Sequence, residues 1–86
     1  MSELSRFCGI IIALYYNDHG RPHVHAITGG EECKIDIRTG EVVVGRISAR
    51  NLKLVQAWLV LREPEVLRAW TRAREGLVPG RIRPLR

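Results

Sequence analysis

The segment from Phe7 to Tyr16 is the longest apolar stretch of this chain without a charged side chain, and it limits the possible folds. It is rich in β-branched and aromatic residues and apolar on both alternating faces, which favours a strand buried on both sides over a helix. The stretch is about half as long as a membrane-spanning helix and follows no basic signal-peptide start. We therefore expect a central strand in a cytoplasmic protein that has no membrane partner.

Three further segments are typical of strands. His23–Thr28 alternates with a period of two, and Gly29-Gly30 is expected to supply the positive φ values that a tight hairpin needs. Cys33–Arg38 alternates in the same way, and a second turn leads into Val42–Val44. Together with the first segment, these patterns predict a four-stranded, mostly antiparallel sheet.

Two helices are expected after the strands. Ser48 is a good N-cap for a helix that runs to about Arg62, and Pro64 suits the first turn of a second helix that Gly76 ends. Each helix has an apolar face, and helices that follow a block of strands usually cover one face of the sheet. With 86 residues the chain has room for one core. We predict a single α+β domain over residues 1–86, with two C-terminal helices packed on one face of the sheet.

The other face of the sheet must also be covered. Because the first strand is apolar on both sides, its second face would be exposed in a monomer unless the C-terminal tail or a partner packs on it. We therefore expect a homodimer or a complex with a partner protein.

Positive charge is concentrated in the second part of the chain. Residues 1–45 carry four basic and six acidic side chains, whereas residues 46–86 carry ten basic and three acidic ones. Such a field attracts nucleic acid phosphates, although a GC-rich genome also enriches arginine on a solvated surface. The candidate nucleic-acid-binding residues are Arg68, Arg72, Arg74, Arg81, Arg83 and Arg86.

The most distinctive chemistry is a histidine cluster that places every histidine of the chain and one carboxylate within eight residues: Asp18, His19, His23 and His25. Residues i and i+2 of a strand share a face, with their Cα atoms roughly 6.5 to 7 Å apart. Imidazoles and a carboxylate are common ligands of divalent transition metals, and three protein ligands leave a position open for catalysis. All four residues are candidate metal ligands.

Two other interpretations of the cluster stay open. His23 and His25 can act as a catalytic acid and base pair without metal, with Arg21 stabilising charge on a phosphate. Alternatively, the histidines hold the loop by hydrogen bonds to the backbone while Asp18 forms an Asx-turn. No glycine-rich phosphate loop, nucleophile elbow or dinucleotide fingerprint offers a competing site.

The chain resembles a family of small bacterial proteins that is classed as a domain of unknown function and has the signature Asp-His-x-Pro-Pro-His-Val-His. Arg21 stands where the family usually has its first proline, and every histidine is in place. The resemblance implies one half of a two-gene toxin and antitoxin type of module, with a small partner protein encoded alongside. It covers nearly the whole chain and rests on Phe7-x-Gly9-Ile10-Ile11-Ile12, Asn17-Asp18-His19-x-x-Pro22-His23-Val24-His25, Ile35-Asp36-Ile37, Gly45-Arg46-Ile47, Val55-Gln56-Ala57-Trp58, Trp70 and Ile82-x-Pro84-Leu85.

These observations lead to three hypotheses about function. The first is a toxin-like component that acts on RNA through the histidine cluster, with the C-terminal arginines as phosphate contacts. The second is a non-catalytic module that binds protein or nucleic acid through the basic half of the chain. The third is a metal-binding protein without turnover.

Overall fold

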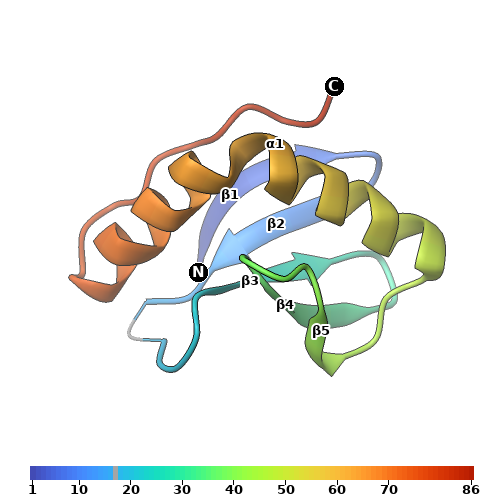
Figure 1. The fold of residues 1–86 in the computed structure, drawn as a ribbon, viewed down its shortest axis with the longest axis horizontal. Coiled ribbons are helices and arrows are strands. Elements are labelled where there is room, and N and C mark those ends of the chain that lie inside the picture. The colour runs from blue at the N-terminus through green and yellow to red at the C-terminus, as the bar shows by residue number, and fades with distance from the viewer. Residues whose placement is uncertain (17) are drawn as a thin grey trace.

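The computed structural model describes residues 1–16 and 18–86, so Asn17 of the loop motif lies outside the described residues. Within them, each strand pairs antiparallel with the next one along the chain, in the spatial order β1-β2-β3-β4-β5. The helix α1 lies across one face of this sheet, and the C-terminal tail returns alongside it (Figure 1). The elements are β1 (Ser2–Phe7), β2 (Ile10–Leu14), β3 (His23–Ile27), β4 (Glu32–Asp36), β5 (Val42–Gly45) and α1 (Ala49–Arg74).

The α+β class and the antiparallel sheet are confirmed, but the prediction of four strands is wrong. The segment 7–16, expected as one strand, contains a hairpin turn, and β1 pairs with β2 so that Phe7 lies opposite Ile10. Cys8 and Gly9 form the turn with φ of 52° and 77°. Positive φ at both turn residues matches the twist of a two-residue hairpin. Cysteine rarely adopts this conformation, so the local residue pattern carries no strong turn signal there.

The two predicted helices are joined in one element, α1, so the predicted number of helices is wrong, but α1 has a kink at the predicted boundary. Arg62 has non-helical angles of φ −117° and ψ 15°, two residues before Pro64. Proline lacks an amide hydrogen, and its ring clashes with the carbonyl group four residues earlier, which kinks a helix. The apolar face continues across the kink, so packing on the sheet keeps the two halves together. Its buried residues are Val55, Trp58, Leu59, Val66, Ala69, Trp70 and Ala73.

The core lies between α1 and the sheet, and the C-terminal tail closes one side of it. The Trp58 indole is fully buried and donates a 2.8 Å hydrogen bond to the carbonyl oxygen of Arg83. The amide of Ile82 donates to the carbonyl oxygen of Leu4 at 2.7 Å, which ties the tail to β1. The C-terminal tail therefore packs on β1 and α1. No helix in the described part of the chain is long and apolar enough to cross a membrane.

Candidate metal centre

Strand β3 presents both histidines of the candidate site on one side. Val24 and Ala26 are fully buried in the core cluster, so the period of two turns the side chains of His23 and His25 to the other side of the strand. Both imidazoles are nevertheless nearly buried, with His23 7% and His25 3% exposed. The connection between β2 and β3 returns the Asp18 side chain to the two rings.

The carboxylate of Asp18 lies between the two imidazoles. Its Oδ2 atom is 3.0 Å from Nε2 of His23 and 3.2 Å from Nε2 of His25. One potential ligand atom from each of the three residues lies within 4.8 Å of the other two. The fold therefore gathers two imidazole nitrogens and a carboxylate oxygen from one strand and the loop before it.

The opposite nitrogen of each ring already faces an acceptor. Nδ1 of His23 is 2.9 Å from the carbonyl oxygen of Arg21, and a carbonyl oxygen can only accept, so this nitrogen carries a proton. Nδ1 of His25 faces the Glu32 carboxylate at 3.5 Å. A neutral ring that carries its proton on Nδ1 has a lone pair on Nε2. If both rings are neutral in this form, both Nε2 lone pairs point at the Asp18 carboxylate, and such short contacts between acceptors require a cation between them. Otherwise each Nε2 atom must carry a proton.

Aromatic packing fixes the orientation of both rings. The Tyr15 ring stacks on His25, with centroids 4.0 Å apart and planes 18° apart. The Tyr15 hydroxyl group donates a 2.9 Å hydrogen bond to Glu32, which raises the pKa of Tyr15, and burial raises this pKa further. The His23 ring packs against the indole of Trp70 of α1, with ring centroids 4.9 Å apart. The side chains around the site thus hold the imidazoles in place without blocking their Nε2 atoms.

The Asp18 side chain is available as an anionic ligand. Burial raises the pKa of this carboxyl group, but when the Nε2 atoms of His25 and His23 carry protons, their hydrogen bonds and charges outweigh burial and lower the pKa below its usual value. Asp18 is therefore ionised at neutral pH.

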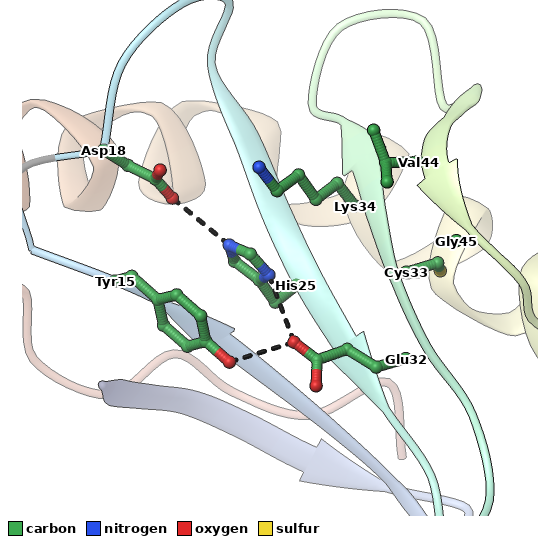
Figure 2. Close-up of a pocket in the computed structure, with 8 residues that line it drawn as sticks. All are labelled: Tyr15, Asp18, His25, Glu32, Cys33, Lys34, Val44 and Gly45. Atoms are coloured by element: carbon green, nitrogen blue, oxygen red, sulfur yellow. Dashed lines mark hydrogen bonds and ion pairs between the residues drawn. The ribbon is translucent and has the colours of Figure 1, made fainter.

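A cavity of about 380 Å³ opens beside the cluster. This volume is within the range of small-molecule sites, at its lower end. Figure 2 shows the side chains of Asp18, Tyr15 and Glu32 around His25, with Lys34 and Val44 on the neighbouring strands. The lining residues are Tyr15, Asp18, His25, Glu32, Cys33, Lys34, Val44 and Gly45.

A family described as a domain of unknown function, DUF4160, matches residues 9–71. The chain belongs to this family. The match includes β2 to β5, the loop that carries Asp18, and most of α1. No curated protein and no solved structure matches the chain. The resemblance seen in the sequence is thus confirmed at the level of a family without assigned activity.

Two of the residues expected at the site of this DUF4160 protein lie outside the cluster. His19 is exposed on the loop and is not part of the three-residue group. The Arg21 side chain is 81% exposed, and its guanidinium lies 3.8 Å from the buried carboxylate of Asp36. Arg21 serves the cluster through its carbonyl oxygen, which fixes the tautomer of His23.

The six candidate nucleic-acid-binding arginines are exposed on α1 and the tail. Arg72 donates to the carbonyl oxygen of Val78 at 2.9 Å, and Arg81 pairs with Glu3 at 3.1 Å. These contacts leave both guanidinium groups at the surface. The cavity beside the histidine cluster therefore contains none of the predicted phosphate contacts.

Six of the eight residues that line the cavity of the DUF4160 protein were not predicted as site residues, and three of these six carry a hydroxyl or charged group: Tyr15, Glu32 and Lys34. Two of them had a signal in the sequence. A hairpin centred on Gly29-Gly30 pairs residues whose numbers are symmetric about that turn, and the structure pairs His25 with Lys34. That register brings Glu32 and Lys34 to the same region of the sheet as the histidines. Tyr15 follows β2 directly, and its stacking on His25 depends on a side-chain orientation that no sequence pattern specifies.

Proposed function

We propose that this DUF4160 protein binds one divalent transition metal ion through Oδ2 of Asp18 and the Nε2 atoms of His23 and His25. The observation that carries the proposal is the engagement of both Nδ1 atoms by acceptors, because it directs both Nε2 lone pairs to one carboxylate oxygen. Metal-binding histidines usually donate their second ring N–H to a carboxylate or a backbone carbonyl group. The Arg21 carbonyl and the Glu32 carboxylate supply both kinds of acceptor here.

A metal ion fits this arrangement better than protons do. Placing a proton on each Nε2 gives two imidazolium rings whose centroids are 5.3 Å apart and which are both nearly buried. Like charges repel strongly at that separation, and burying a charge is costly. One divalent ion satisfies the carboxylate and both lone pairs at once.

The proposed chemistry is metal-dependent hydrolysis. A divalent ion held by three protein ligands keeps an open coordination position, where it polarises a substrate oxygen or lowers the pKa of a water molecule. Asp18 and His25 both line the cavity, so a substrate held there lies beside the cluster. Tyr15 and Glu32 shield the far side of His25 and keep its ring in a single orientation.

Elemental analysis tests the metal proposal. Tag-free protein, loaded with zinc and then desalted, should retain one equivalent, and the His23→Ala, His25→Ala double variant should retain almost none. His19→Ala is the matched control, because this histidine lies on the same loop but outside the cluster, and it should keep the full equivalent. An equal loss in the control, or no retention by the parent, would refute the proposal.

A second candidate is toxin-like action on RNA, with a small partner protein as the antitoxin. It is supported by the family resemblance, by the cavity beside the cluster and by the excess of basic side chains in residues 46–86. Induced expression without the partner should slow bacterial growth, and His25→Ala should relieve the effect. Circular dichroism and thermal melts of His25→Ala must match the parent, since loss of a buried histidine can also destabilise a small core. Equal toxicity of the two proteins would argue against catalysis.

One edge of the sheet is a candidate binding surface for the expected partner protein or for a second copy of this chain. Strand β5 is an edge of the sheet, and its Val43 and Val44 side chains are 56% and 57% exposed. Exposed edge strands with apolar side chains tend to pair with another chain. Light scattering after size-exclusion chromatography should show a dimer of the isolated protein or a complex with the partner, and a Val43→Lys variant should weaken it.

A further inference from the structure

Lys34 is the one cationic side chain that lines the cavity, as far as the described residues show. It lies on β4 directly opposite His25 in the strand pairing. Figure 2 shows its amino group directed across the strand toward the space beside Asp18 and His25. Among the ion pairs of the described residues, none involves Lys34. Lys34 as a residue is half-buried, and its ammonium group faces the cavity without a counter-charge in contact among the described residues.

The charge of the cavity depends on the metal ion. Asp18 and Glu32 contribute two carboxylates and Lys34 one ammonium group, which leaves a net negative charge when the histidines are neutral. A divalent ion in the cluster reverses the sign. With the ion bound, the cavity would offer an open coordination position beside the Lys34 ammonium group, and these two positive groups would attract an oxyanion.

We propose that Lys34 and the metal ion together form a subsite for a phosphate group, so that the substrates of the site are small phosphate esters. The inference rests on the proposed metal centre. Lysine binds phosphate as a compact point charge, and a divalent ion takes a second phosphate oxygen. Val44 and the aliphatic stem of Lys34 offer an apolar wall for the organic part of the ester.

The volume sets an upper limit on this organic part. A cavity of about 380 Å³ has room for a phosphate group with a substituent of the size of one sugar or one ring. A longer phosphodiester chain must therefore extend out of the cavity. The site would then contact one phosphate group and its nearest substituent.

Calorimetry with inorganic phosphate as the probe tests the subsite directly. The protein is loaded with zinc and desalted, and its zinc content is measured before each titration. We expect phosphate binding by the zinc-loaded parent and at least tenfold weaker binding by the metal-free parent. Lys34→Gln should keep its zinc and bind phosphate about tenfold or more weakly, whereas Lys34→Arg should stay close to the parent. Lys53→Gln is the matched control, since Lys53 is the other lysine of the chain and lies exposed on α1.

The outcomes separate the subsite from the metal centre. If Lys34→Gln retains zinc and binds phosphate as tightly as the parent, the subsite is wrong and the metal centre stands. If the zinc-loaded parent binds no phosphate, the subsite is likewise wrong. If the parent retains no zinc, the metal centre itself fails, and the subsite fails with it. Phenyl phosphate in place of inorganic phosphate should bind more tightly, and a Val44→Ser variant should reduce that gain.

Discussion

Nδ1 of His25 lies 3.5 Å from Oε2 of Glu32, and the same oxygen accepts the hydrogen bond of Tyr15. Glu32 thus holds the imidazole from the side opposite Asp18, and it does so from the neighbouring strand β4. The strand pairing therefore supplies both the ligand and the group that orients it. A site built on paired strands is more precise than one built on loops alone.

Removing Glu32 should weaken metal binding without removing a ligand. Outer carboxylates that orient a metal-binding histidine typically contribute about 10 to 100-fold in affinity. We expect a reduction of this size for Glu32→Ala in a zinc competition titration with a chromogenic chelator. Glu31→Ala is the neighbouring control and should keep the affinity of the parent. Equal affinities for all three proteins would show that the position of His25 does not depend on Glu32.

Binding to RNA should be weak and sensitive to salt. Neutralising a phosphate releases counterions, so the logarithm of affinity falls linearly with the logarithm of salt concentration. Replacing Arg83 and Arg86 in the tail by serine should lower that slope by about one for each arginine that neutralises a phosphate in the parent. Arg38→Ser, at the turn between β4 and β5, serves as the surface control. If the salt dependence of binding is the same in the tail variant and the parent, Arg83 and Arg86 do not contact phosphate and belong to the solvated surface.

The buried carboxylate of Asp36 should contribute to stability against acid. Burial raises its pKa, but the amide hydrogen bonds of Thr39 and Arg38 outweigh burial and lower the pKa below its usual value. A lowered pKa stabilises the fold at pH values above the unfolded pKa of about 3.9, and this contribution is lost as the pH falls through the folded pKa.

Asp36→Asn should therefore be less stable than the parent at pH 7 and lose less stability below about pH 4. Urea denaturation of the metal-free proteins at several pH values measures both effects. Glu41→Gln, at an exposed position, should keep the pH dependence of the parent. Parallel curves for the parent and Asp36→Asn would contradict the role given to this carboxylate.

Replacing Gly9 in the first turn should destabilise the fold because of its backbone conformation and not because of a steric clash. Gly9 has φ of 77°, and a Cβ atom placed there meets nothing within 4 Å. A non-glycine residue in this region costs about 1 to 2 kcal/mol. Thermal melts should show a destabilisation of that size for Gly9→Ala. Gly29→Ala, which has neither a positive φ nor a close neighbour, should be nearly neutral.

Local patterns predicted the parts of the fold that depend on local chemistry. Gly29-Gly30 predicted the position of the hairpin between β3 and β4, but neither glycine has the positive φ that was expected of it. Ser48 accepts a hydrogen bond from the amide of Asn51, as an N-cap should. The first hairpin was missed, because Cys8 is an unusual residue for a left-handed turn. The continuity of α1 past Pro64 was missed as well, since packing of its apolar face outweighs the local cost of the proline.

In the candidate site, too, local sequence predicted some features, whereas others depend on the tertiary structure. The spacing of His23 and His25 placed both rings on one face of a strand, which the structure also shows. The choice of Asp18 rather than His19 as the third group depends on the path of the loop. The roles of Glu32 and Tyr15 depend on side-chain orientation across three strands. Neither kind of information is present in the local sequence.

The central claim is that both histidines carry their proton on Nδ1 and offer Nε2 to one metal ion. Long-range nitrogen-15 correlation spectra of the imidazole rings, recorded before and after one equivalent of zinc, read both properties directly. We predict that zinc shifts the Nε2 resonances of His23 and His25 together, that both rings keep their Nδ1 protons, and that His19 is unaffected. Unchanged Nε2 resonances after zinc addition, or a response confined to His19, would contradict the claim.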